Sequence, residues 1–114
     1  MIKDSLAYLL HMRDSAVAVV QYTSNHTFEE YSENPWDQAA AVRNLEIIGE
    51  AANHVDSEFR KKHSQIPWRD IIDFRNVAIH DYIDLDDNMV WNVITKDVPA
   101  LLVELNKIIE SEDK

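Results

Sequence analysis

The spacing of apolar positions along the chain predicts a series of amphipathic helices. Between residues 2 and 24, apolar side chains recur at steps of three and four, which places them along one stripe of a helix. A second stripe follows Pro35 and steps through Leu45 and Val55 to Phe59. Because such a seam is typical of a helix packed in a bundle, we expect this helix to be the longest up to that point.

Local signals in the first half indicate where helices begin. Thr27 and Glu30 have the spacing of a capping box, which predicts a short helix over residues 28–32. Asn34 followed by Pro35 predicts the start of the long helix, because Asn caps free N–H groups and Pro suits the first helical position.

The second half of the chain carries similar signals. Pro67 predicts a further helix start. The acidic stretch 84–88 predicts a break and a cap. Positions 90–108 then keep one apolar phase through Pro99, which indicates a single kinked helix. Residues 110–114 are expected to form a frayed tail.

These elements predict an all-α, antiparallel bundle of four to five helices, formed as one domain over residues 1–114. Hydrophobic residues make up 46% of the chain, and a single glycine and three prolines leave too few turn residues for an all-β protein. The absence of cysteine excludes disulfides and thiolate metal sites. No apolar run near the N-terminus is long enough to span a bilayer, so we expect a soluble, cytoplasmic protein with no membrane partner.

The net charge of −10 argues against a dedicated nucleic-acid binder, because contacts to phosphate need cations. It is compatible with an enzyme that holds RNA at one local cationic spot, or with a partner that has a basic face. The basic run 60–63 is either a solvated helix end or a phosphate-contacting patch. The candidate RNA contacts are Arg43, Arg60, Lys61 and Lys62; DNA is not expected as a partner.

The densest functional chemistry lies in residues 75–82. Asn76 and His80 are four residues apart and share a helix face. Arg75 and His80 are five apart, about 140° round the helix and roughly 7.5 Å along its axis. The long Arg75 side chain can curl back, so that its guanidinium and the imidazole converge on one ligand.

This pair suits cleavage of RNA by attack of a ribose 2′-hydroxyl on the neighbouring phosphate. Arginine holds phosphate oxygens with two parallel hydrogen bonds, and histidine transfers protons near neutral pH. One imidazole does not easily serve as base and acid in the same step. We therefore predict a homodimer, in which a second Arg75 and a second His80 complete the site across the interface.

Other interpretations of these residues remain open on spacing alone. An arginine and a histidine near a helix end commonly cap carbonyls or pair with a neighbouring carboxylate, here Asp73, Asp81 or Asp84. A metal bundle is suggested by Glu46, Glu50 and His54, which share a face. Di-iron bundles, however, use a Glu-to-His spacing of three, twice, and here the spacing is four and occurs once. No metal and no cofactor are therefore expected.

The pattern Arg-Asn-x-x-x-His at residues 75–80 resembles that of the HEPN superfamily of helical ribonucleases. With Tyr82 two residues after the histidine, the longer pattern is similar to the HepT toxin family. Three further stretches resemble the second long helix of that family, the lead-in to its catalytic helix and its last helix: residues 43–52, 66–72 and 97–99.

The resemblance implies a HEPN-like, dimeric, metal-independent endoribonuclease toxin in which Arg75, Asn76 and His80 are catalytic, with RNA as substrate and tRNA as one candidate. It also implies a cognate minimal nucleotidyltransferase antitoxin that silences the toxin by transferring AMP to Tyr82. An anionic adduct there would occupy the phosphate site and repel RNA. The alternatives are a non-catalytic helical subunit that binds such a nucleotidyltransferase, and a purely structural dimeric bundle.

Overall fold

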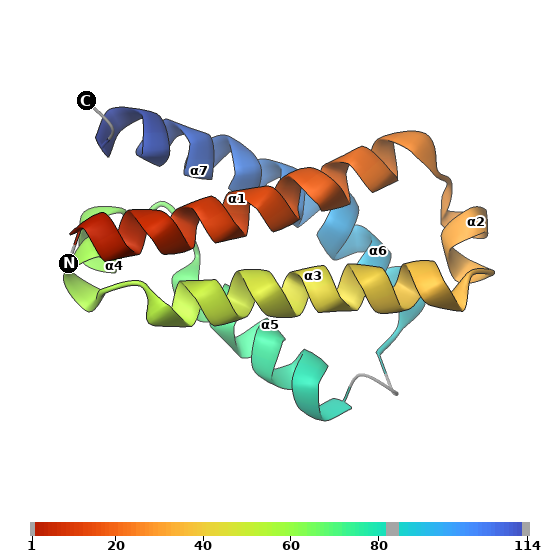
Figure 1. Ribbon diagram of the computed structural model, residues 1–114. Helices are drawn as coiled ribbons and strands as arrows, with labels where there is room; N and C mark the ends of the chain where they lie inside the picture. The colour runs from red at the N-terminus through yellow and green to blue at the C-terminus, as the bar shows by residue number, and fades with distance from the viewer. Residues whose placement is uncertain (1, 82–84, 113–114) are drawn as a thin grey trace.

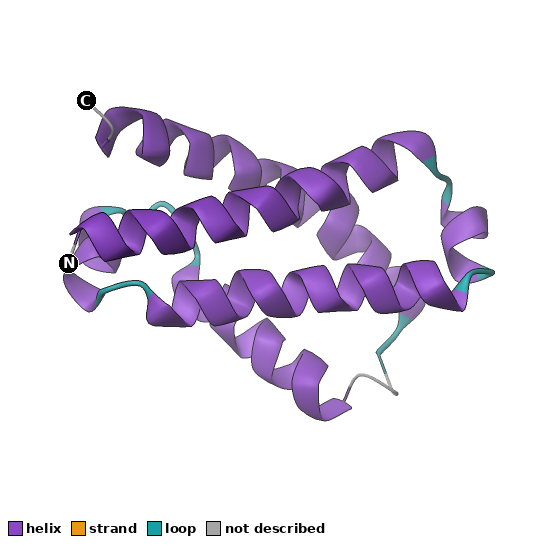
Figure 2. Cartoon of the chain, viewed as in Figure 1, coloured by secondary structure: helices purple, strands orange, loops and turns teal. Residues whose placement is uncertain are grey.

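The computed structural model of the protein describes residues 2–81 and 85–112, without the side chains of residues 2, 3 and 79–81. Within these ranges the chain is helical and contains no strand, which confirms the all-α prediction (Figure 2). The elements are α1 (Ile2–Asn25), α2 (Phe28–Ser32), α3 (Pro35–His54), α4 (Ser57–Lys62), α5 (Trp68–Asp81), α6 (Asp87–Asn92), the π-helical turn η2 (Val93–Asp97) and α7 (Val98–Glu112).

Helix α1 lies at the centre of the arrangement, packed against both α3 and α7 (Figure 1). Helices α1 and α3 run in opposite directions, so the prediction of an antiparallel bundle is confirmed. Helix α5 packs chiefly against α3 and diverges from the other helices. Interdigitated side chains from α1, α3, η2 and α7 fill the core, and those with almost no exposed surface include Leu9, Met12, Ala16, Ile48, Ala52, Ile94, Leu105 and Ile108.

The predicted caps are formed. The Thr27 hydroxyl accepts from the Glu30 N–H at 3.2 Å, and the Glu30 carboxylate accepts from the Thr27 N–H at 2.8 Å. The Asn34 side-chain oxygen accepts from the N–H groups of Trp36 and Asp37 at the start of α3. Both helix starts are therefore fixed by the side chains that the sequence indicated.

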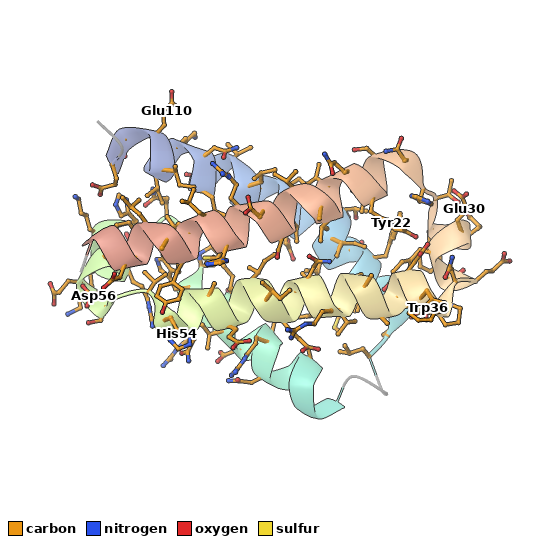
Figure 3. All side chains as sticks on the ribbon, in the orientation of Figure 1. Tyr22, Glu30, Trp36, His54, Asp56 and Glu110 are labelled. Carbon is orange, nitrogen blue, oxygen red and sulfur yellow. The ribbon has the colours of Figure 1, made fainter. Side chains whose placement is uncertain are left out.

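The prediction that the helix after Pro35 continues to Phe59 is wrong. Helix α3 ends at His54, because Val55 adopts an extended conformation with φ −69° and ψ 134°. The Asp56 N–H then donates to the Ser5 hydroxyl of α1 at 3.1 Å, at the end of α3 where α1 begins (Figure 3). Phe59, which belongs to α4, is nevertheless buried in the core. The spacing of apolar residues therefore does not reveal the break between α3 and α4.

The last segment is one helical run, as predicted, but its distortion differs from a simple kink. Pro99 has no N–H to donate, and the preceding residues widen into η2, in which the Val98 N–H bonds to the Val93 carbonyl. The prediction of a frayed tail is wrong as far as residue 112. Helix α7 ends at Glu112, whose carboxylate lies 2.8 Å from both Lys62 Nζ and His63 Nε2.

Helix α5 crosses α3 closely at Gly49. A Cβ at this position would overlap the Arg75 Cβ, lie 2.8 Å from the Arg75 Cγ and lie 3.1 Å from the Ile71 carbonyl oxygen. The crossing thus sets Arg75 directly over the backbone of α3. None of the helices that the structure describes is long and apolar enough to cross a membrane.

Candidate functional site

Helix α5 carries the motif residues, and its start is anchored to the end of α4. The buried Trp68 donates its indole N–H to the His63 carbonyl at 3.0 Å. The Ile71 N–H donates to the Pro67 carbonyl at 3.1 Å, which begins the helical ladder just before the apolar face meets α3. The position of α5 is therefore set at its first turn and at its crossing with α3.

The Arg75 side chain is half-buried, and its two ends have different environments. Its stem lies on α3, and its Nε has no surface exposed to solvent and no hydrogen-bond partner among the described residues. Its Nη1 donates to the side-chain oxygen of the exposed Asn76 at 2.9 Å. No carboxylate of the described residues forms an ion pair with this guanidinium, whose outer N–H groups are of the kind that hold an anion.

The structure places only part of the predicted motif. The backbones of His80 and Asp81 belong to α5, so the helical spacing of His80 from Arg75 is as expected. The His80 side chain and the whole of Tyr82 lie outside the described residues. The convergence of Arg75 with His80, and the modification of Tyr82, therefore stay predictions, while Arg75 and Asn76 are in direct contact.

The four candidate RNA contacts are all engaged within the chain. Arg60 donates from Nε to the Val55 carbonyl and from Nη2 to the Asn53 carbonyl, at 3.0 Å each, and so closes the C-terminal end of α3. The other three form ion pairs with carboxylates: Arg43 with Glu46 at 3.5 Å, Lys61 with Glu58 at 3.7 Å and Lys62 with Glu112 at 2.8 Å.

These ion pairs differ in how easily a phosphate could replace them. The side chains of Lys61 and Arg43 are 77% and 63% exposed, and such surface pairs contribute little free energy. The ion pair between Lys62 and Glu112 differs from these surface pairs. The Glu112 carboxylate accepts hydrogen bonds from both Lys62 and His63, and these bonds lower its pKa. Contacts to RNA from these residues stay a prediction.

An open hollow of about 520 Å³ lies beside the first half of α5. Arg60, Lys61 and Arg69 line it together with Trp68 and Asp73. Arg69 is exposed and forms no ion pair with a described residue, and it was not among the RNA contacts predicted from the sequence. It lies six residues before Arg75, about 9 Å along the helix axis.

Two of the three residues of the alternative metal site, Glu46 and His54, are engaged elsewhere. Glu46 pairs with Arg43, and the ring of His54 stacks on Tyr8 with centroids 5.2 Å apart. Among the described residues, no group of three or more His, Asp or Glu side chains is placed to hold a metal ion.

An antiparallel helical bundle with Arg75, Asn76 and His80 on one helix is the arrangement that the resemblance to the HEPN superfamily implied. The family described as "Ribonuclease HepT-like" matches residues 12–108, and the chain belongs to this family. This match confirms the predicted class of enzyme, an endoribonuclease.

Several curated proteins are similar over nearly the whole chain. "Gamma-glutamylcyclotransferase and putative RNase MJ0434" of Methanocaldococcus jannaschii is 37% identical over 112 residues, which are 98% of this chain and 50% of that protein. The chain thus spans half the length of that relative. "Putative RNase MJ1380" of the same organism is 33% identical over 90% of this chain and 94% of its own length. "Probable ribonuclease HepT" of Thermococcus cleftensis is 31% identical, with 89% and 92% covered. No solved structure matches the chain.

Proposed function

We propose that this chain is a metal-independent endoribonuclease toxin that cleaves RNA at a site formed by the α5 helices of two copies. The observation that carries the proposal is that the Arg75 guanidinium forms no ion pair with a described carboxylate. The chain has 21 acidic and 11 basic residues, yet no described carboxylate pairs with this guanidinium. In so acidic a protein, a half-buried cation with no counter-ion among the described residues is suited to hold an anionic ligand.

The chemistry follows from the residue types. Arg75 donates two hydrogen bonds to the non-bridging phosphate oxygens and stabilises the charge that develops on them. His80 of one copy takes the proton of the 2′-hydroxyl as the bond from O2′ to phosphorus forms. The protonated His80 of the second copy gives its proton to O5′ as the bond from phosphorus to O5′ breaks. The products are a 2′,3′-cyclic phosphate and a 5′-hydroxyl.

Asn76 has a supporting role in this proposal. Its side-chain oxygen accepts the hydrogen bond of Arg75 Nη1 at 2.9 Å, which restricts the rotation of the guanidinium. Its amide N–H₂ group is left free of any bond to the described residues and can donate to the same phosphate.

The exposed side of α5 supports the proposal of a dimer. Val77, which follows Asn76, is 44% exposed, and α5 packs chiefly on α3 alone. A two-fold contact between two α5 helices would cover this side chain and bring the two motifs together. RNA would then approach along the hollow lined by Lys61 and Arg69.

The toxin is proposed to be controlled by a minimal nucleotidyltransferase antitoxin that transfers AMP to Tyr82. Support comes from the family resemblance and from the position of Tyr82, two residues after His80. The adduct would add a negative charge and a bulky group beside the phosphate site, so RNA would be excluded. The net charge of −10 suits a partner with a basic face.

The decisive test is cleavage of total RNA and purified tRNA by the parent chain, Arg75→Ala and His80→Ala, all in the presence of a chelator. We expect 2′,3′-cyclic phosphate ends from the parent chain and none from Arg75→Ala or His80→Ala. Lys107→Ala is the matched control, because it removes one exposed cation, which pairs with Glu104 on α7, without touching α5. Equal cleavage by His80→Ala would overturn the mechanism. No cleavage by any form, with tight binding to the nucleotidyltransferase, would favour the non-catalytic subunit.

A further inference from the structure

Gly49 is the only glycine of the chain, and it stands in the interior of α3. A glycine inside a helix costs about 1 kcal/mol relative to alanine. Its backbone conformation does not require glycine, because no residue that the structure describes has a positive φ. The reason for a glycine at this position must therefore be the space that its missing side chain leaves.

That space is filled by Arg75. A Cβ at position 49 would overlap the Arg75 Cβ and come within 2.8 Å of the Arg75 Cγ. The nearby Ile71 carbonyl oxygen, 3.1 Å away, belongs to the backbone of α5 and cannot rotate aside. Any side chain at position 49 would therefore push α5 away from α3, and Arg75 would move with it.

The close approach also fixes where the guanidinium points. With its Cβ and Cγ against the backbone of α3, the Arg75 side chain buries its Nε and leaves Nη1 at the surface beside Asn76. A buried Nε without a partner costs free energy, so a loosely held arginine would turn this group toward water. The packing over Gly49 prevents that movement.

We infer that Gly49 is a positioning residue of the ribonuclease site: by lacking a side chain, it holds Arg75 against α3 and aims its guanidinium at the phosphate. This inference rests on the proposed function for its catalytic consequence. The geometric part, that Gly49 fixes Arg75, can be tested without any RNA. It differs from ordinary helix packing because the side chain over the glycine is the motif arginine.

The first test is the exchange of the Arg75 Nε–H with solvent, followed by ¹⁵N NMR, in the parent chain, Gly49→Ala and Glu50→Ala. Glu50 is the exposed neighbour on the same helix, so its variant is the matched control. We expect a protected Nε–H in the parent chain and in Glu50→Ala, and loss of protection in Gly49→Ala. Equal protection in all three would overturn the inference.

The second test separates catalysis from binding. We expect Gly49→Ala to lower kcat by roughly 10²-fold while KM for RNA stays nearly unchanged, because small displacements of a catalytic group affect the transition state most. Unchanged kcat would overturn the inference. A parent chain without any cleavage would refute the proposed function, and the exchange measurement would still decide the role of Gly49.

A third variant covers the case in which Gly49→Ala fails to fold. The double variant Gly49→Ala with Arg75→Gly removes the Cβ and Cγ that the new methyl group would meet. We expect the free energy cost of Gly49→Ala, measured by urea unfolding, to be much smaller in the Arg75→Gly background than in the parent. An equal cost in both backgrounds would show that Arg75 is not the group over Gly49, and would overturn the inference.

Discussion

Replacement of Arg75 by methionine should make the protein more stable and inactive at once. Methionine keeps an unbranched stem over Gly49 but removes the buried Nε, which has no hydrogen-bond partner among the described residues. An unsatisfied buried donor costs about 1–3 kcal/mol. The variant also loses the exposed hydrogen bond from Nη1 to Asn76, which is worth about 0.5–1.5 kcal/mol. The balance is a gain of about 1 kcal/mol.

Urea unfolding measures this gain, and a thermal scan should show a rise in Tm of roughly 4 °C. The matched control is Arg60→Met, because Arg60 donates two hydrogen bonds of 3.0 Å to backbone carbonyls. We expect that control to lose roughly 2–4 kcal/mol. RNA cleavage by Arg75→Met should fall at least 10²-fold. If Arg75→Met were destabilised as much as Arg60→Met, the guanidinium would be a structural group and the reasoning would be refuted.

Three further predictions concern the framework around α5. Because hydrogen bonds from Lys62 and His63 lower the pKa of Glu112, the stability that this carboxylate contributes is present above its ordinary pKa of 4.5. That stability is lost as the pH falls through the lowered pKa of Glu112 in the folded state. The protection of backbone amides at the end of α7 from hydrogen exchange should therefore fall in the parent chain and not in Glu112→Gln. Trp68→Phe removes the 3.0 Å hydrogen bond to the His63 carbonyl and should cost about 1–2 kcal/mol in urea unfolding, and an unchanged midpoint would contradict it. Thr27→Ala removes a helix cap and should cost about 1 kcal/mol, whereas Thr27→Ser should cost almost nothing.

Much of the fold could be predicted from the sequence, because local side chains fix several helix ends. Thr27, Asn34 and Pro67 each indicated a start within a residue or so of the observed one. The break after His54 could not be found in this way. It depends on the contact of Asp56 with α1, and the apolar phase continues across it.

The candidate site likewise has features that could be predicted from the sequence and features that could not. The motif on α5 could be read from its spacing, because Arg75 and Asn76 are neighbours on one helix. The role of Arg60 could not be predicted, since the backbone carbonyls that accept its hydrogen bonds are free only where α3 ends. Gly49 carried a signal, a single glycine inside a predicted helix, but the residue that fills its space is set by the crossing of α3 and α5.

The acidity of the chain and its proposed substrate are compatible because of where the cations lie. Lys61 and Lys62 are paired with carboxylates, whereas Arg69 and Arg75 form no ion pair with a described residue. A net charge of −10 weakens contact with RNA at every phosphate in both the ground state and the transition state. Such uniform repulsion raises KM but leaves kcat unchanged. Only a group that binds the transition state more tightly than the substrate changes kcat, and in the proposed mechanism this group is Arg75, held over Gly49.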